Sequence, residues 1–375
     1  MRPERLTAAK NKIHALTSAR FFAALYVILW HTQWGVDPNG GFYRFVAVGP
    51  ASVCFFFLLS GYILGVVYLG KNRDIDKRSF YVARIARVYP LYFISVLADT
   101  PFAIAARVAK YGLIVAVKRV VVLVAIGSCM MQMWLPTLTV VNIPAWSLAI
   151  EAVFYLIFPF LGPWLWKRGS RSIAIVAMLL YLFSVGAHWF LFHYYSHDPL
   201  AAFVLPSYVA TFAIGILVSR WQNLRAAQNS DTLSDRTAWT LLALIGLAFA
   251  AVAYNSLWLM SHGIHLGLLL APVSATAICV LSSSHIAPIR WLNAPWLVVL
   301  GEASYGMYLL HVPILHTLRY LNLSGSISNY PLALALIIGI SLLSFYYFET
   351  PARRWIVSRF HARTRETMEV ASDAQ

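Results

Sequence analysis

Long apolar runs alternate with short polar segments along most of the chain. Most of these runs approach the roughly 20 apolar residues that a helix needs to cross a bilayer. We therefore predict an all-α fold, a polytopic membrane helix bundle with about ten transmembrane helices. The predicted spans are residues 16–34, 46–69, 120–134, 146–166, 173–195, 201–219, 237–259, 266–283, 297–318 and 331–348.

Lysine and arginine are concentrated in alternate polar segments, such as residues 71–78, 167–171 and 220–236, and after Pro351. Cytoplasmic loops of membrane proteins are enriched in these two residue types. We therefore expect these segments, and both chain termini, on the cytoplasmic side. The chain then divides into a cytoplasmic N-terminal segment (1–15), a transmembrane domain (16–350) and a basic cytoplasmic tail (351–375).

Residues 88–106 depart from this pattern. They are apolar, but Pro90, Asp99 and Pro101 interrupt them, and the basic residues of 107–119 follow. A single crossing would place those basic residues outside, against the charge rule. We therefore expect residues 88–106 to form a re-entrant or in-plane hairpin that lines a protein cavity.

Composition supports the membrane assignment. Hydrophobic residues make up 60% of the chain and charged residues only 11%, whereas soluble domains have about 25% charged residues. The formal net charge is +15, but the basic residues are scattered over short loops and one tail, so nucleic acid is excluded as a partner. Cys54, Cys129 and Cys279 fall in apolar spans and give neither a disulfide framework nor a metal site.

The first span carries two ionisable residues, Arg20 and His31. At about 100° per residue their separation leaves a net rotation of only about 20°, so both lie on one stripe of the helix. They are roughly 16 Å apart along its axis. Such a pair suits an anionic donor at Arg20 and activation of an acceptor at His31. The alternative is that Arg20 extends to the cytoplasmic headgroups and His31 lies in the outer interface.

The segment 144–159 places Trp146, Ser147 and Glu151 near the outer end of another span. A carboxylate inside a membrane needs a partner, and we expect Glu151 to pair with His31 at the same depth. A carboxylate on one imidazole nitrogen raises the basicity of the other, which suits general-base catalysis. The alternative is a structural bridge that holds two helices together.

Other spans also contain polar positions. Ser60 and Gly61 lie inside the second span, where small residues indicate either close helix packing or a backbone approach to a ligand. Arg84 and Arg87 lie three apart on one helical face. Tyr308 and His311 belong to an inward polar stripe and are either site residues or satisfied core residues.

Six motifs occur in a recognisable order, and together they carry a resemblance. They are LTSARFFAALYVILWH, FFFLLSGY, FYVARIARVYPLY, PAWSLAIEAVFYLIFP, SYGMYLLHVP and YYFETP. In this order they resemble the acyltransferase-3 family of integral membrane acyltransferases, over about residues 16–354. The chain ends soon after its last span, so it resembles the standalone type that acts on exopolysaccharide or cell-surface glycans.

The resemblance implies a ten-span enzyme of a bacterial inner membrane. Such an enzyme moves an acyl group, commonly acetyl, from cytoplasmic acyl-CoA to a hydroxyl of a carbohydrate, glycan or lipid-linked acceptor. The family's Arg and His of the first span fall on Arg20 and His31, its arginine pair on Arg84 and Arg87, and its W-S-L-x-x-E element on residues 146–151. We expect acyl-CoA as a co-substrate, with no tightly bound cofactor and no metal, and a homo-oligomer in the bilayer is compatible with this.

These observations indicate an acyl-transfer mechanism, and they leave one alternative function. In the mechanism Arg20, Arg84, Arg87 and Ser60 bind the acyl donor, His31 and Glu151 are catalytic, and Trp146, Ser147, Tyr308 and His311 bind the acceptor. The rival is a transporter or flippase of a glycan or lipid-linked substrate, because inward polar groups in a many-span bundle also line transport paths. The missing repeat symmetry argues against that rival.

Overall fold

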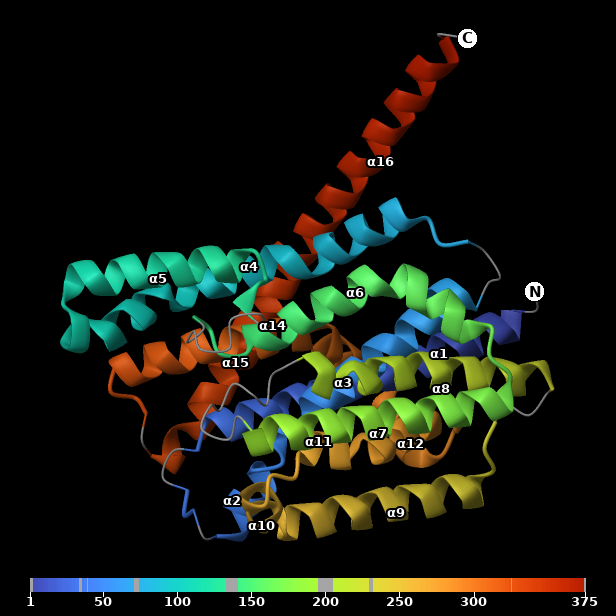
Figure 1. Cartoon of the computed structure of the whole chain (residues 1–375), viewed down its shortest axis with the longest axis horizontal. Helices are drawn as coiled ribbons and strands as arrows, with labels where there is room; N and C mark the ends of the chain where they lie inside the picture. The colour runs from blue at the N-terminus through green and yellow to red at the C-terminus, as the bar shows by residue number, and fades with distance from the viewer. Residues whose placement is uncertain are drawn as a thin grey trace.

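The computed structural model describes residues 3–33, 36–38, 40–70, 74–132, 141–194, 205–228, 232–324 and 326–373. Within these ranges every regular element is helical, so the all-α prediction is confirmed. The long helices run broadly along one direction, and α16 projects away from the bundle (Figure 1).

The α-helices are α1 Pro3–His31, α2 Gly41–Val46, α3 Ser52–Leu64, α4 Lys77–Tyr111, α5 Leu113–Ser128, α6 Ala145–Trp166, α7 Ser170–Tyr194, α8 Val209–Ala227, α9 Asp235–Tyr254, α10 Ser256–Ser261, α11 Leu266–Leu269, α12 Ala271–Ser283, α13 Ala287–Leu292, α14 Pro295–Tyr320, α15 Tyr330–Ser344 and α16 Thr350–Asp373. Two π-helical turns extend this set. The turn η2 (Gly65–Leu69) continues α3, and η7 (Phe345–Glu349) joins α15 to α16 without a break.

Seven helical segments in the described part of the chain are long and apolar enough to cross a membrane. They are Gly41–Leu69, Lys77–Tyr111, Ala145–Trp166, Ser170–Tyr194, Asp235–Tyr254, Pro295–Tyr320 and Tyr330–Ala362. The predicted count of ten spans and the cytoplasmic position of both termini stay predictions. The predicted span ends at 34, 133–134, 195 and 201–204 lie outside the described residues.

The hairpin predicted at residues 88–106 is wrong. Helix α4 runs continuously through Pro90 and Pro101, because a proline removes only one helix hydrogen bond and packed membrane helices tolerate that loss. The chain reverses instead at Gly112, whose φ of +72° is readily adopted only by glycine. Helix α5 then packs back along α4 (Figure 1).

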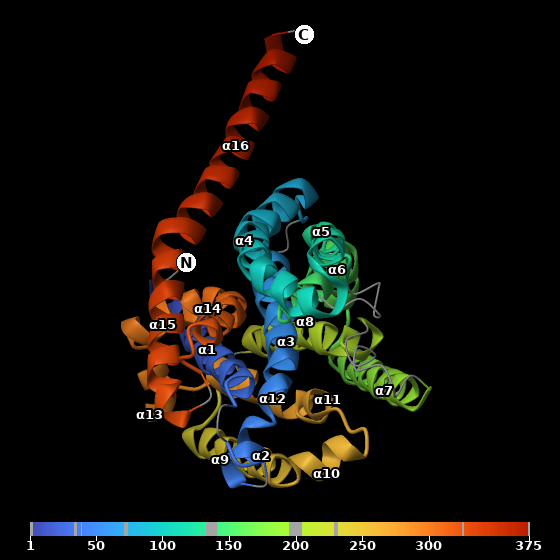
Figure 2. The ribbon, with the colours of Figure 1, turned by 90° about the vertical axis from the view of Figure 1, so that its left-hand side faces the viewer.

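Helix α3 is the centre of the bundle. Viewed along the bundle, it lies between α1 and α14 on one side and α8 on the other (Figure 2). Nine of its thirteen residues are buried and the other four are half-buried, as expected for a helix that is hydrophobic all round. By contrast, α7 and α9 expose most of their apolar residues, as expected of helices that face lipid.

Glycines bring α3 and α8 into backbone contact. A Cβ atom at Gly61 would lie 2.0 Å from the carbonyl oxygen of Phe212, and one at Gly215 would lie 2.0 Å from that of Leu58. Neither oxygen belongs to a flexible side chain, so any side chain here must push the helices apart. The predicted packing role of the small residues in the second span therefore holds for Gly61.

This contact predicts a stability effect. We expect Gly61→Ala and Gly215→Ala to lower the apparent Tm of the purified protein by about 2–12 °C, because overpacking typically costs about 1–3 kcal/mol. Gly186→Ala and Gly246→Ala are the matched controls, since a Cβ there meets open space and alanine favours a helix. Thermal unfolding in detergent measures the difference, and an unchanged Tm for Gly215→Ala would contradict the proposed packing.

Candidate active site

A cavity of about 160 Å³ lies between α1, α3, α4, α6 and α14. Its polar lining comes from Arg20, Ser60, Arg84, Arg87, Ser147, Glu151, Tyr155, Ser304, Tyr305 and Tyr308, and apolar residues of α3, α4 and α6 complete it. A cavity of about 150 Å³ accommodates a benzene-sized molecule. The space is thus large enough for a small acyl or phosphate group.

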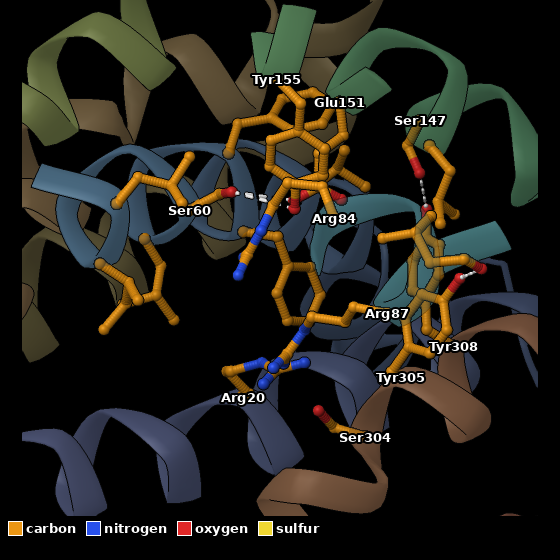
Figure 3. A pocket seen from close by; sticks show the side chains of 18 residues that line it. Arg20, Ser60, Arg84, Arg87, Ser147, Glu151, Tyr155, Ser304, Tyr305 and Tyr308 are labelled. Carbon is orange, nitrogen blue, oxygen red and sulfur yellow. Dashed lines mark hydrogen bonds between the residues drawn. The ribbon is translucent and has the colours of Figure 1, made fainter. Parts of the chain in front are cut away.

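Three guanidinium groups face this cavity (Figure 3). Arg84 Nη2 donates to the Tyr68 hydroxyl at 3.3 Å, and the Arg84 Cζ atom lies 5.7 Å from the ring centroid of Tyr68 and 5.9 Å from that of Tyr155. Among the described residues, Arg20 and Arg87 form neither a hydrogen bond nor an ion pair. Their guanidinium N–H groups are therefore available to an anionic ligand.

The start of α4 positions two of these arginines. Asp76 caps the helix by accepting the backbone N–H groups of Arg78 at 3.1 Å and Ser79 at 3.4 Å. Hydrogen bonds from the Ser79 side chain and backbone hold the pKa of the Asp76 carboxyl below its usual value. With the helix fixed at this end, Arg84 and Arg87 project from the same face, as their spacing predicts.

Glu151 lies inside the cavity and is held by two hydroxyl groups. Ser60 Oγ donates to Glu151 Oε1 at 2.8 Å, and the Tyr155 hydroxyl donates to the same oxygen. The carboxylate thus faces the arginines across the cavity (Figure 3). The predicted pairing of Glu151 with His31 is wrong, since no hydrogen bond joins them in the described structure. The sequence pattern gave the face of each helix correctly but not the relative depth of the two side chains.

A hydroxyl pair forms one wall of the cavity. Ser147 Oγ lies 2.7 Å from the Tyr308 hydroxyl and also donates to the Pro144 carbonyl at 3.0 Å. The Tyr308 hydroxyl approaches the same carbonyl at 3.4 Å. Two residues predicted to bind the acceptor are therefore in the same cavity as the arginines predicted to bind the donor.

His31 and His311 form a pair beyond this wall. Their ring centroids are 4.9 Å apart, and the Tyr308 ring lies 6.2 Å from that of His311. Each Nδ1 faces a helix carbonyl, that of Val27 at 2.9 Å for His31 and that of Met307 at 3.2 Å for His311. A carbonyl only accepts hydrogen bonds, so Nδ1 carries the proton of each neutral ring and Nε2 keeps its lone pair. Both imidazoles are therefore oriented as bases, by the backbone and not by Glu151.

The cavity unites most of the predicted site residues, which are Arg20, Ser60, Arg84, Arg87, Ser147, Glu151 and Tyr308. The others lie outside its lining. The His311 ring lies 6.2 Å from that of Tyr308, and the His31 ring lies 4.9 Å from that of His311. Trp146 packs against the Tyr208 ring with centroids 5.5 Å apart.

Sequence reasoning missed several polar residues. Tyr155 lies four residues after Glu151, on the same helical face, and this spacing was available as a signal. Tyr305 lines the cavity and donates to the Val88 carbonyl at 2.6 Å. His316 lies 2.6 Å from Asp99, but the two lie on helices far apart in the chain, so the sequence does not pair them.

Comparisons with known proteins agree on one family. The sequence profile of a family described as "Acyltransferase domain" (Acyl_transf_3) matches residues 13–349. The chain is 25% identical over 363 residues to the O-acetyltransferase OatA of Staphylococcus aureus, covering 90% of this chain and 57% of that protein. It therefore spans little more than half the length of that relative.

Two further relatives come from other bacteria. Nodulation protein 10 of Rhizobium leguminosarum bv. viciae is 23% identical over 358 residues, which cover 89% of this chain and 92% of that protein. Acyltransferase MdmB of Streptomyces mycarofaciens is 30% identical over 174 residues, which cover 44% of this chain and 41% of that protein. No solved structure matches the chain significantly. The profile covers nearly all of the transmembrane region, and the chain belongs to the acyltransferase-3 family of integral membrane acyltransferases.

Proposed function

We propose that this protein is a membrane-embedded O-acyltransferase that moves an acetyl group from cytoplasmic acyl-CoA to a hydroxyl group of a carbohydrate or glycan acceptor. The observation that carries the proposal is the convergence of Arg20, Arg84 and Arg87 on one cavity. Three guanidinium groups at one place suit phosphate, which they bind through pairs of hydrogen bonds. Coenzyme A supplies such phosphates together with a reactive thioester.

In this proposal the donor binds with its phosphates at the arginines. The cavity is too small for a whole nucleotide, so the nucleotide lies outside it and the flexible thioester arm extends along the path towards Tyr308. Ser60 and Glu151 hold their positions through their mutual hydrogen bond and shape the narrow part of this path. The acceptor enters from the side of Trp146, Ser147 and His311.

His31 is the general base of the proposed reaction. Its Nε2 lone pair takes the proton of the acceptor hydroxyl while the hydroxyl oxygen forms a bond to the thioester carbonyl carbon. The carbon–sulfur bond then breaks, and the imidazolium returns the proton to the departing thiolate, so that an ester and free coenzyme A result. A variant of this scheme has His31 carry the acyl group transiently. The Val27 carbonyl, by fixing the tautomer, supports either role.

The relatives support a bacterial setting. Two of the three relatives carry names that include acetyltransferase or acyltransferase, and all three come from bacteria. We place the protein in the cytoplasmic membrane of a bacterium, where acyl-CoA is available on one side. It uses acyl-CoA as a co-substrate without a tightly bound cofactor, and self-association is compatible with the scheme.

Radiolabelled acetyl-CoA tests the proposal directly. Purified protein in liposomes is expected to bind the labelled acetyl-CoA and to release acetate or transfer the acetyl group. Acetyl-CoA should be consumed faster when a crude glycan fraction is added. Equilibrium binding and thin-layer separation of the products measure the two steps. A folded, monodisperse preparation that neither binds nor consumes acetyl-CoA would contradict the proposal and favour transport of a glycan or lipid-linked substrate.

A further inference from the structure

A second polar cluster lies beyond the paired imidazoles on α14. His316 Nδ1 is 2.6 Å from Asp99 Oδ1, and Asp99 Oδ2 accepts the backbone N–H of Asn142 at 3.1 Å. The Asn142 side chain in turn donates to Ser95 Oγ and to the Leu309 carbonyl, each at 3.0 Å. The Asp99 carboxylate of α4 is thus fixed by partners from α14 and from the segment before α6.

The two members of this pair differ in exposure. The Asp99 side chain is 6% exposed and that of His316 is 33% exposed. A buried carboxylate is costly unless donors satisfy it, and Asp99 has two. Because the carboxylate accepts from Nδ1, the His316 proton is held there and Nε2 is left as a hydrogen-bond acceptor on the far side of the ring. The pair therefore presents one oriented acceptor atom at the accessible side of the imidazole.

The position of His316 relates it to the path from the cavity. Tyr305 and His316 are separated by a net rotation of about 20° at about 100° per residue, so they lie on one face of α14. At a rise of about 1.5 Å per residue, His316 is roughly 7 Å beyond His311 and roughly 16 Å beyond Tyr305. His316 thus lies on the face of Tyr305 and about 140° around α14 from His311, so the imidazole pair and His316 are on different faces of the helix.

Two buried polar atoms, one on α14 and one in the Asp99 cluster, have no partner among the described protein residues. His311 Nε2 and Asn142 Oδ1 are both buried, and neither finds a hydrogen-bond partner among the described residues. Both residues are fully buried, and an unsatisfied buried polar atom is costly. Each of these atoms therefore lacks a hydrogen-bond partner, one on α14 and one in the segment that holds the Asp99 carboxylate.

The surroundings of His316 indicate the class of ligand. The Phe102 ring lies with its centroid 5.6 Å from that of His316, so an apolar flat surface stands beside an oriented hydrogen-bond acceptor. A sugar ring offers the matching features, an apolar face and several hydroxyl donors.

We infer that Asp99 and His316 form a binding site for a second hydroxyl group of a carbohydrate acceptor, apart from the hydroxyl that reacts near His31. His316 Nε2 accepts the hydrogen bond from this hydroxyl, Phe102 packs against the sugar, and Asp99 is a positioning residue. The inference rests on the proposed acyl transfer and specifies how the acceptor is held. It predicts a role in acceptor affinity and none in donor binding.

The test uses the natural acceptor in its unacylated form. The glycan fraction extracted from cells in which the gene is deleted serves as the acceptor, and radiolabelled acetyl-CoA serves as the donor. Purified full-length wild type, His316→Gln and Asp99→Asn are compared for donor affinity, for the half-saturating acceptor concentration and for kcat. We expect the half-saturating acceptor concentration to rise about three- to tenfold in both variants, because each variant loses one hydrogen bond to the acceptor. The donor affinity and kcat are expected to stay near the wild-type values.

His262→Gln is the matched control, because His262 is an exposed histidine whose Nδ1 faces the carbonyl of Trp258 and no carboxylate. A purely structural clamp between α4 and α14 would instead lower the Tm and weaken donor binding, which would overturn the inference. A kcat reduced 100-fold at unchanged acceptor affinity would also overturn the inference, since that result would make His316 the base. Wild-type kinetics in His316→Gln would overturn it as well. Failure of the proposed function looks different, because the wild type itself would then transfer no acetyl group, and both proposals would fall.

Discussion

Replacing His31 by alanine is expected to lower the rate of acyl transfer by about 10²- to 10⁴-fold, the usual contribution of general-base catalysis. The His31 ring lies beside that of His311, which neighbours the Tyr308 ring of the cavity lining. Its Nδ1 faces the Val27 carbonyl, so only Nε2 is free to take a proton from the acceptor. Removal of the ring removes that base and leaves the donor site in place.

Steady-state transfer from radiolabelled acetyl-CoA measures this effect, together with donor affinity and Tm of the same preparation. His14→Ala is a suitable control, because His14 lies earlier on the same helix and outside the cavity. His311→Ala separates the two imidazoles, since loss of His311 is expected to reduce the rate less than loss of His31. Turnover at the wild-type rate in a folded His31→Ala variant would remove His31 from the mechanism.

Replacing Arg20 or Arg87 by methionine is expected to weaken acetyl-CoA binding about 10- to 150-fold, because a hydrogen bond to a charged group contributes about 1.5–3 kcal/mol. Methionine retains much of the apolar stem and removes the charge. Neither arginine has an internal hydrogen-bond partner within the described residues, so the substitution breaks no hydrogen bond or ion pair there. Arg84 is a less clean target, because its guanidinium also packs against aromatic rings.

Two comparisons make this test specific. A phosphate-free acetyl thioester should bind wild type and the arginine variants equally, since it lacks the groups that the guanidiniums would hold. Arg44→Met is the control for general loss of charge, because Arg44 donates to the Tyr254 carbonyl on a different part of the bundle. Equal acetyl-CoA affinity in wild type, Arg20→Met and Arg87→Met would show that the donor phosphates bind elsewhere.

The sequence predicted which face of a helix a side chain occupies better than its depth along the bundle. The spacing of Arg84 and Arg87 and the stripe of Arg20 correctly indicated one inward basic site, and Ser60 lies there with them. The expected bond between Glu151 and His31 was wrong because hydrophobic periodicity says which way a side chain points and not how far along the bundle it lies. Glu151 is satisfied by Ser60 and Tyr155 instead.

The sequence also failed to predict which distant residues pair and where the chain reverses. Prolines in residues 88–106 suggested a hairpin, but packed helices tolerate proline, and the glycine with positive φ marks the real reversal. Asp99 was visible as a charge in an apolar run, yet its partner His316 is 217 positions away. Contacts of that kind come from the packing of α4 against α14 and leave no local pattern in the sequence.

The backbone contacts made by glycine have a mechanical consequence for substrate entry. Gly61 and Gly215 join α3 to α8, and in the same way a Cβ at Gly301 of α14 would lie 2.0 Å from the Thr17 carbonyl oxygen of α1. Ser60 and Ser304 of the cavity lining belong to these two helix pairs. We therefore expect each pair to move as one rigid unit, and the cavity to widen when the two pairs move apart. A cross-link between α1 and α3 should therefore trap bound donor inside, whereas one between α3 and α8 should leave its exchange unchanged.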